Sequence, residues 1–447
     1  MNKVRKSVMG VLCFNDEYLF VKRQNYLTVF PGYTSFPGGK VEKEDDCNLP
    51  SMLEGFSSKL IECLRRELME EVGFDLFKEI ACGQVVDVIN LGKVITPDFN
   101  PARFENFYFQ INLKEKPNIV FDKNEIESIS WETANKVLNR FRNDEILIVP
   151  PMLKLINGIT SNLSLPLSLD LIYDSKKEVP TINPVHSVKQ LLPLSNTFPP
   201  ANRTNCFVLG DEGQRTVVVD PSPRDEIEYE KLKNSLSKYT IDLIFLSHHH
   251  PDHHEYSTVL AKNLNLPIGM SKDTRTRIES KYGDRYFDNI GVEIFNGGDV
   301  LTICNAENVV LHETPGHDEG QLSIIPVSKK WAILSDLFQS IGTVVIGAPE
   351  GDMKKYFASL EKIIEMKPNV IFPSHGIALG GVEKLIQTLG HRRDREKQVY
   401  ELYTQGANEE QMLQVIYKGV DERLFPYARK TISAHLKKLE DEGKIKR

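Results

Sequence analysis

The fold is decided by residues 241–253, which read Ile-Asp-Leu-Ile-Phe-Leu-Ser-His-His-His-Pro-Asp-His. The first part of this stretch is an apolar run that predicts a buried β-strand, and the histidine-rich part begins where that strand ends. The spacing His-x-His-x-Asp-His delivers several ligands from one loop, namely His248, His250, Asp252 and His253. Imidazole nitrogens and carboxylate oxygens are ligands that zinc prefers. The stretch therefore predicts a metal site at a strand terminus.

The remaining ligands must come from elsewhere in the chain, because two metal ions need roughly six ligands and a shared oxygen. Further short apolar runs between about 180 and 390 each end in a candidate ligand. Helical stretches alternate with these runs, which is typical of an α/β sandwich. The candidates at the ends of the runs are Asp220, His317, Asp336 and His375.

This order of motifs resembles the metallo-β-lactamase superfamily throughout 180–390. The resemblance implies two Zn²⁺ ions that acidify a bridging water, which attacks an ester, thioester or phosphodiester. Asp252 is then a catalytic residue as well as a ligand. The implied first site is His248, His250 and His317, and the second is Asp252, His253 and His375, with Asp336 bridging and Asp220 orienting ligands from behind.

Three residues near this loop stand outside the ligand pattern. Glu255 occupies a position where the family often has glycine, and we expect it to narrow the mouth of the pocket. His249 and His254 alternate with the ligands, and we interpret them as scaffold residues, with substrate contact as the alternative.

The first part of the chain carries a second constellation, on a helix predicted over 58–72 that stops at Gly73. Glu67, Glu70 and Glu71 have the spacing i, i+3 and i+4, so a helix places all three carboxylates on one face. Their mutual repulsion destabilises the bare helix, and a hard divalent cation such as Mg²⁺ would relieve it.

Together with Phe-Pro-Gly-Gly at 36–39, this helix resembles the Nudix hydrolases over about 1–160. The upstream residues Leu19, Arg23 and Gly32 match the coenzyme A diphosphatase subgroup. The match departs from the family where Asp45 takes the place of an expected glutamate and where an insertion precedes the helix. The resemblance implies Mg²⁺ or Mn²⁺ bound by Glu67, Glu70 and Glu71, with Glu67 and Glu70 catalytic and Arg66 supporting them from behind.

The tail after His391 predicts helices and resembles the lactamase-like protein 2 group, which has a winged-helix-like cap and includes a mitochondrial endoribonuclease. If the cap binds single-stranded RNA, the expected phosphate contacts are Arg392, Arg393, Arg395, Lys437 and Lys438. The alternative is a helical domain that packs against the rim of the active site and binds no nucleic acid.

We therefore expect an α+β and α/β multidomain chain of 447 residues. Its expected parts are a Nudix α/β/α fold at 1–165, a linker at 166–180, a metallo-β-lactamase αβ/βα sandwich at 181–390 and a winged-helix-like cap at 391–447. The net charge of −7 argues against a generally basic nucleic-acid binder. Six cysteines without a CxxC pair predict reduced thiols in a cytoplasmic protein, and no apolar stretch is long enough to span a membrane.

Three functions stay open for the whole chain. In the first, the Nudix part cleaves a nucleoside-diphosphate linkage, as in coenzyme A or its acyl derivatives, and the lactamase part hydrolyses a small ester or thioester. In the second, the lactamase part is a nuclease of single-stranded RNA and the Nudix part handles nucleotides. In the third, the Nudix part binds a ligand without catalysis.

Overall fold

The computed structural model describes residues 4–97, 99–100, 103–161 and 165–446. The chain divides into two compact units. The N-terminal unit comprises Met1–Tyr173 with Asn183–His186, and the C-terminal unit comprises Asp174–Ile182 with Ser187–Arg447. The tail after His391 and the lactamase-like part belong to the same C-terminal unit.

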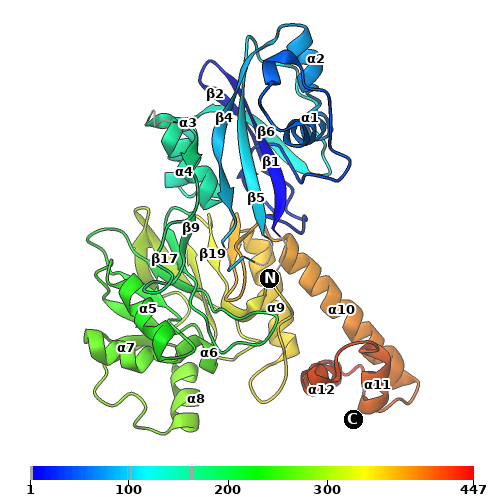
Figure 1. Ribbon diagram of the computed structural model, residues 1–447. Coiled ribbons are helices and arrows are strands. Elements are labelled where there is room, and N and C mark those ends of the chain that lie inside the picture. Colours follow the sequence, from blue (N-terminus) through cyan, green and yellow to red (C-terminus); the bar gives the residue numbers. More distant parts are fainter. Residues whose placement is uncertain (1–3, 98, 101–102, 162–164, 447) are drawn as a thin grey trace. The chain divides into compact units, whose positions relative to one another are not determined.

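The N-terminal unit is built on an 8-stranded sheet of order β7-β3-β2-β1-β5-β4-β8, with β6 paired to β2. Helices lie on both faces of this sheet (Figure 1). The strands are β1 (Arg5–Phe14), β2 (Glu17–Arg23), β3 (Tyr33–Ser35), β4 (Val85–Ile95), β5 (Phe104–Leu113), β6 (Ile126–Thr133), β7 (Leu147–Ile148) and β8 (Leu167–Ser168). The helices are η1 (Ser51–Leu53), α1 (Ser58–Val72), α2 (Leu76–Ala81), α3 (Ala134–Arg142) and α4 (Pro150–Thr160).

The alternation of side chains along β1 explains these layers. Val8 and Leu12 face the core that α1 covers, whereas Val11 points into the core beneath α3 and α4. Helix α1 buries Leu64 and Leu68 against β1, so its glutamate-rich face is turned away from most of this core.

Helix α1 ends where the sequence predicted. Gly73 adopts φ 68°, and its N–H donates to the carbonyl of Met69 at 3.1 Å. The next amide, from Phe74, reaches back to the carbonyl of Leu68 at 3.0 Å. This is a glycine C-cap that satisfies the last carbonyls of the helix, and the predicted helix 58–72 is confirmed.

The C-terminal unit contains two sheets. The 7-stranded sheet has the order β15-β14-β13-β12-β11-β10-β9, and the 6-stranded sheet has the order β16-β17-β18-β19-β20-β21. The first consists of β9 (Thr181–Val185), β10 (Val188–Leu191), β11 (Cys206–Leu209), β12 (Val217–Val219), β13 (Leu243–Phe245), β14 (Ile268–Met270) and β15 (Val292–Ile294). The second consists of β16 (Val300–Cys304), β17 (Glu307–Glu313), β18 (Leu322–Pro326), β19 (Ala332–Ile333), β20 (Val370–Phe372) and β21 (Leu379–Gly380).

The pairing of these strands brings the candidate ligands to shared edges. Strands β12 and β13 are parallel, so the residues after them, Asp220 and the histidine-rich loop, lie at the same sheet edge. Strands β19 and β20 are also parallel, so Asp336 and His375 lie together at an edge of the second sheet. The carboxyl ends of parallel strands meet at one edge, and loops there carry sites in α/β folds.

Helices complete this unit (Figure 1). They are α5 (Glu226–Leu236), α6 (Pro251–His254), α7 (Ser257–Leu264), α8 (Lys272–Tyr282), η2 (Ser335–Leu337), α9 (Met353–Met366), α10 (Glu383–Thr404), α11 (Glu409–Ile416), η3 (Glu422–Leu424) and α12 (Phe425–Asp441). The last helices share a small core of their own that includes Val399, Leu413 and Ile432. None of the helices formed by the described residues has the length and apolar character that crossing a membrane requires.

Candidate metal centre and Nudix site

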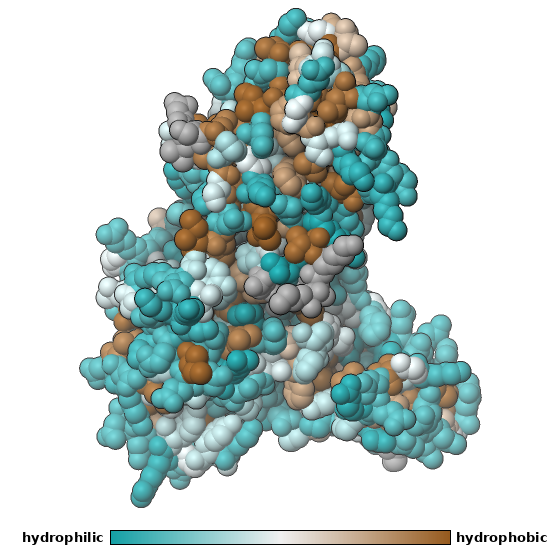
Figure 2. All heavy atoms as spheres, in the orientation of Figure 1, coloured by the Kyte–Doolittle hydropathy of each residue, from teal (hydrophilic) through white to brown (hydrophobic). Residues whose placement is uncertain are grey.

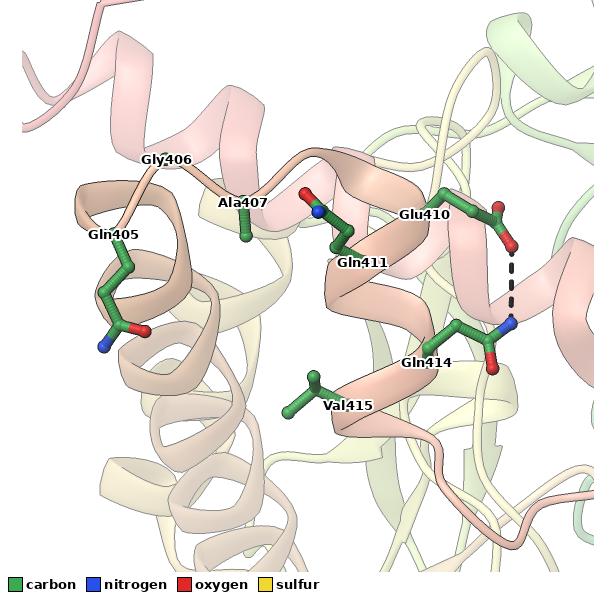
Figure 3. A pocket seen from close by; sticks show the side chains of 7 residues that line it. All are labelled: Gln405, Gly406, Ala407, Glu410, Gln411, Gln414 and Val415. Atoms are coloured by element: carbon green, nitrogen blue, oxygen red, sulfur yellow. Dashed lines mark hydrogen bonds between the residues drawn. The ribbon is translucent and has the colours of Figure 1, made fainter.

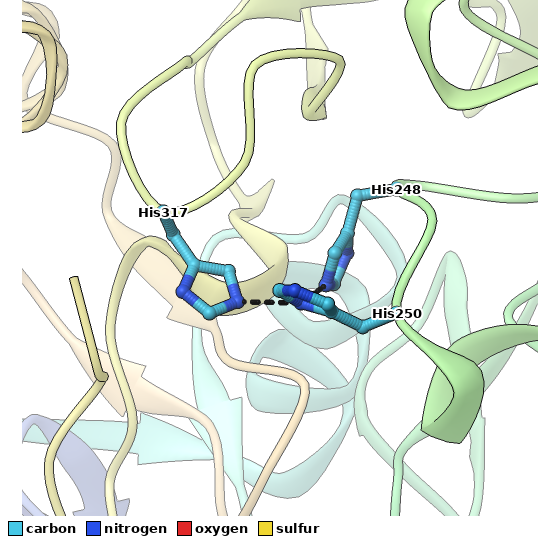
Figure 4. A group of neighbouring side chains, drawn as sticks. All are labelled: His248, His250 and His317. Atoms are coloured by element: carbon cyan, nitrogen blue, oxygen red, sulfur yellow. Dashed lines mark hydrogen bonds between the residues drawn. The ribbon is translucent and has the colours of Figure 1, made fainter. Parts of the chain in front are cut away.

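Three imidazoles converge at the centre of the C-terminal unit (Figure 4). His248 and His250 come from the loop after β13, and His317 comes from the loop after β17. The Nδ1 atom of His250 lies 2.9 Å from Nε2 of His248 and 2.9 Å from Nε2 of His317. Three nitrogens this close, from segments far apart in the sequence, form the tripod that the sequence predicted for a first metal.

A second group adjoins the first. Ligand atoms of Asp252, His253 and His375 lie within 4.8 Å of one another. Nε2 of His375 is 3.5 Å from Oδ2 of Asp252 and 3.5 Å from Oδ1 of Asp336. The other oxygen of Asp336, Oδ2, is 3.5 Å from Nε2 of His317 in the first group. The two oxygens of one carboxylate thus face both groups.

Backing hydrogen bonds set the direction of each ring. Nδ1 of His317 lies 2.9 Å from the carbonyl of Val345, and Nδ1 of His375 lies 2.9 Å from the carbonyl of Arg203. Nδ1 of His253 lies 2.9 Å from Asp220. Because one ring nitrogen donates backwards in each case, the other nitrogen is left to ligate, which is the usual arrangement around protein-bound zinc.

Asp220 anchors the histidine-rich loop as well as His253. The carboxylate accepts from the backbone N–H of Ser247 at 2.8 Å and from its hydroxyl at 2.6 Å. Asp220 is almost fully buried and has φ 49°, a left-handed conformation that aspartate and asparagine tolerate better than other non-glycine residues. The carboxylate therefore lies behind the site, where the sequence placed it.

The electrostatics of the cluster suit metal binding. Burial and the neighbouring imidazoles hold the pKa of His248 and of His250 well below the usual value, so both rings are neutral, as metal ligands must be. Burial also opposes a charge on His253, but Asp252, Asp220 and Asp336 outweigh it and raise its pKa to about 10. The carboxylates therefore attract positive charge to this point, which is the charge that a metal ion supplies.

Unsatisfied atoms give an independent test of the fit. Nε2 of His253 and Oδ1 of Asp336 are buried, and no described residue is a hydrogen-bond partner of either atom. A buried polar atom left unpaired is costly, and a metal ion is one of the few partners that satisfies a nitrogen and an oxygen at once. The residues present thus fit the dinuclear group implied by the sequence.

The histidines outside the ligand pattern have scaffold contacts. Nδ1 of His254 bonds to the hydroxyl of Tyr286 at 2.8 Å, and its Nε2 bonds to the carbonyl of His249 at 3.1 Å. His249 is paired with Asp318, which directly follows the ligand His317. Asp318 is fully buried, and nothing in the sequence pattern singled it out, because a single aspartate after a ligand carries no spacing signal.

The loop from Asn196 to Arg203 lies beside the candidate ligand cluster. The Thr197 hydroxyl is 3.4 Å from Nε2 of His375, the nitrogen that faces the second group. Asn196 donates to Glu255 at 2.8 Å, so the residue that replaces the expected glycine ties this loop to the metal-binding loop. The ring of Phe198 meets Tyr427 of α12 edge to face, with centroids 4.9 Å apart.

The glutamates of the N-terminal unit differ from one another in environment. Glu71 is 5% exposed, and its Oε2 accepts the N–H of Gly38 at 2.8 Å. Burial raises the pKa of Glu71 to about 8. Glu67 packs against Gly39, where a Cβ atom would lie 2.3 Å from its Oε1. The Phe-Pro-Gly-Gly segment and the glutamate helix therefore lie against each other, and glycine is required at Gly38, where φ is +150° and a Cβ would lie 2.1 Å from the carbonyl oxygen of Val8.

Arg66 joins the acidic side chains of this site. Its Nη1 lies 2.8 Å from Glu67 and 3.2 Å from Glu70, and its Nε lies 3.1 Å from Asp45. Asp45, the substitute for the expected glutamate, is thus joined to the helix despite the insertion between them. Among the described residues of this unit the carboxylate oxygens do not converge as closely as the ligands of the C-terminal unit. The donors are all oxygens, which suits Mg²⁺ or Mn²⁺.

Glu125 is a further acid that sequence reasoning missed. It is exposed, and its charge contributes to the raised pKa of both Glu67 and Glu71. It precedes β6 in the chain and reaches the glutamate helix only through the tertiary fold, so no motif spacing could have identified it.

Basic residues of the tail are mostly engaged within the protein. Arg392 and Lys438 are buried, and Lys438 lies 2.8 Å from Glu396 and 2.8 Å from Glu442. The other three cations proposed as phosphate contacts, Arg393, Arg395 and Lys437, contact Glu361, Ile416 and Asp441 respectively. Hydrophilic residues predominate on the visible face of this region (Figure 2). Arg393 and Lys437 each form an exposed ion pair with a carboxylate.

A hollow of about 480 Å³ lies between the end of α10 and α11 (Figure 3). Its lining combines glutamine side chains with apolar groups, including Ala407 and Val415. The one acid, Glu410, bonds to Gln414 and is paired with Arg429. It contains none of the ligating side chains, so the hollow does not belong to either candidate site.

Comparison with known families agrees with this geometry. Residues 4–150 match the NUDIX domain, residues 199–375 match the metallo-beta-lactamase superfamily, and residues 409–447 match the beta-lactamase associated winged helix domain. The described part of the winged-helix match is helical, with α11 and α12 as its main elements.

Individual relatives resemble the C-terminal unit. A beta-lactamase-like protein 2 homolog of Drosophila melanogaster is 29% identical over 259 residues, which cover 54% of this chain and 84% of that protein. A hydroxyacylglutathione hydrolase of Wigglesworthia glossinidia brevipalpis is 29% identical over 167 residues, 37% of this chain and 58% of that protein. A beta-lactamase domain protein from Burkholderia ambifaria has a similar fold, with TM-score 0.51 and 16% identity over 61% of this chain and 90% of that one.

The expected three-part composition is thereby confirmed: the chain joins a Nudix domain to a metallo-β-lactamase superfamily domain with its associated winged-helix domain, and it is a hydrolase.

Proposed function

We propose that the chain is a bifunctional metal-dependent hydrolase with two separate sites. The C-terminal site would bind two Zn²⁺ ions and act on an ester, thioester or phosphodiester. The observation that carries this proposal is the bridging position of Asp336, whose two oxygens face His317 and His375 at 3.5 Å each. The proposed domain limits are 1–165, 181–390 and 391–447.

The residues have distinct roles in the proposed site. His248, His250 and His317 hold the first ion, and Asp252, His253 and His375 hold the second. When bound, the two ions supply Lewis acidity and lower the pKa of a water molecule. Asp220 keeps His253 in the tautomer that ligates, and Thr197 offers a hydroxyl beside His375 for a polar group of the substrate.

A small acyl substrate is favoured over RNA. The Wigglesworthia relative is named for the hydrolysis of hydroxyacylglutathione, and an acylglutathione is a small thioester. Of the five cations expected to bind phosphates, Arg392 and Lys438 are buried, and Arg393 and Lys437 are exposed but each pairs with a carboxylate, which weakens the case for a phosphate-binding row of positive charge. RNA binding generally depends on such charge.

In the N-terminal unit, Glu67, Glu70 and Glu71 would bind Mg²⁺ or Mn²⁺, with Glu67 and Glu70 catalytic and Arg66 positioning them. The substrate would contain a nucleoside-diphosphate linkage, as in coenzyme A or its acyl derivatives. The carboxylates gathered beside Gly38 and Gly39 support this proposal, because glycine lets Glu67 and Glu71 approach the backbone closely and so gathers oxygen donors that suit a hard divalent cation.

Metal analysis followed by a substrate screen tests both proposals. Protein purified without chelator should contain two transition-metal ions for each chain. It should hydrolyse members of a panel of coenzyme A thioesters, dinucleotides and single-stranded RNA. Loss of thioester hydrolysis in Asp252→Ala, with diphosphate hydrolysis intact, would support two sites. At most one bound transition metal would contradict the dinuclear proposal, and diphosphate hydrolysis unchanged in Glu70→Gln would contradict a catalytic Nudix site.

A further inference from the structure

Arg392, on α10, is a charged side chain in an unusual place. It is 3% exposed, and its Nη2 donates to the carbonyl of Val344. Its guanidinium lies over the ring of Tyr356, with Cζ 5.8 Å from the ring centroid. Its Nε is buried without a hydrogen-bond partner among the described residues. Burying a guanidinium is costly, so its contacts need an explanation beyond the packing of α10.

The next residue after Val344 contacts a candidate metal ligand. Val345 accepts from Nδ1 of His317 at 2.9 Å, and this bond sets the direction in which Nε2 points. On the other side of the segment, Gly347 lies so close to Lys430 of α12 that a Cβ there would be 2.7 Å from the lysine Cβ. The segment that orients His317 therefore contacts residues of both α10 and α12.

Tyr356, on α9, connects Arg392 to the segment that carries Asp336. Its hydroxyl donates at 2.8 Å to the carbonyl of Leu337, the residue after Asp336. Its backbone packs against Gly316, the residue before His317, where a Cβ would lie 2.3 Å from the tyrosine Cα. Gly316 has φ +135°, so no other residue fits there without strain.

We propose that Arg392 is a positioning residue of the metal centre. Through Val344 it holds the segment that orients His317, and through Tyr356 it supports the chain that carries Asp336. The C-terminal helices would then be part of the hydrolase site rather than a separate nucleic-acid module. This inference rests on the proposed dinuclear centre. Groups bonded directly to metal ligands typically contribute about 10–100-fold to metal affinity, and Arg392 acts one contact further out, so its contribution should be smaller.

The test measures metal affinity in the full-length chain. Arg392→Met keeps the length of the side chain but removes the charge and its hydrogen bond. Tyr356→Phe removes only the hydroxyl that reaches Leu337. Lys397→Met is the matched control, because Lys397 is an exposed cation on the same helix. Zinc affinity would be measured by competition with a chromophoric chelator, and site geometry by the visible absorption spectrum of the cobalt-substituted protein.

Arg392→Met should lower zinc affinity by up to about 10-fold and alter the cobalt spectrum. Tyr356→Phe should alter the spectrum in the same direction by a smaller amount, and Lys397→Met should change neither. Zinc affinity and a cobalt spectrum equal to those of the unaltered protein in both Arg392→Met and Tyr356→Phe would overturn the inference. If Arg392→Met does not fold, Arg392→Lys and Tyr356→Phe decide by the same measurements. Failure of the unaltered protein to bind any transition metal would instead overturn the proposed centre itself.

Discussion

Replacing Asp220 with asparagine should weaken the second metal site without disturbing the backbone. Asp220 has φ 49°, and asparagine tolerates this conformation nearly as well as aspartate does. The change therefore isolates the carboxylate charge. The amide has one acceptor where the carboxylate has two, and the native carboxylate accepts from the Ser247 amide, the Ser247 hydroxyl and His253 Nδ1.

The expected magnitude follows from this geometry. If the amide oxygen keeps the bond to the Ser247 N–H, its NH₂ group faces the ring of His253. His253 must then carry its proton on Nε2, the nitrogen that should ligate, or lose its backing bond. Loss of a carboxylate behind a ligating histidine typically lowers metal affinity about 10–100-fold, which corresponds to about 1.4–2.7 kcal/mol.

The assay is zinc titration against a chelator of known affinity, together with thermal unfolding of the metal-free protein. Asp211→Asn serves as the control, because Asp211 accepts backbone N–H bonds from Asn305 and Ala306 in a hairpin remote in sequence from all ligands. That variant should change stability but not zinc affinity. If Asp220→Asn binds two zinc ions as tightly as the unaltered protein, the role assigned to Asp220 is wrong.

The remaining predictions concern both units. Asp336→Ala should abolish hydrolysis at the C-terminal site, because it removes the carboxylate shared by both ligand groups; turnover above a tenth of the original rate would argue against bridging. Glu71→Gln should slow diphosphate hydrolysis by orders of magnitude and leave the C-terminal activity unchanged, and equal loss of both activities would argue against separate sites. Burial raises the pKa of Glu71 from 4.5 to about 8, so the folded state binds this proton more tightly than the unfolded chain. Metal-free protein should therefore lose stability as the pH rises from about 4.5 to about 8, and chemical unfolding of Glu71→Gln should show a smaller decline over that range. Residues 170–447 should bind single-stranded RNA weakly at low salt; metal-dependent cleavage that disappears in Asp252→Ala, with a salt slope near −0.7 for each phosphate neutralised, would favour a nuclease instead.

In the N-terminal unit, motif spacing predicted the glutamate helix and the place of Asp45. The helix 58–72 and its end at Gly73 followed from local signals, because apolar periodicity and a glycine cap act within one segment. The spacing of the motif placed Asp45 where a glutamate was expected. In the structure, Oδ1 of Asp45 lies 3.1 Å from Nε of Arg66. Strand β4 and helix α4 were not predicted, since the burial of β4 does not alternate regularly and α4 begins with two prolines.

In the tail after His391, the sequence could not predict which basic residues are buried. Its basic residues were grouped by composition alone, but burial separates Arg392 and Lys438 from the exposed ones. Whether a cation meets solvent, a carboxylate or a carbonyl depends on which helix packs against it. Nothing within the tail itself indicates that Val344 accepts from Arg392.

By itself, the sequence determined the order of the domains and the residue types at each strand end, because strands, loops and ligand spacing are local properties. One loop carries His248, His250, Asp252 and His253, so their spacing alone predicted a shared metal site. Only the tertiary structure decided that one oxygen of Asp336 faces His317 while the other faces His375, and that Asp318 lies beside His249. It also decided that α10 and α12 flank the segment that orients His317. These relations join residues far apart in the chain, and they depend on how two sheets and the C-terminal helices pack together.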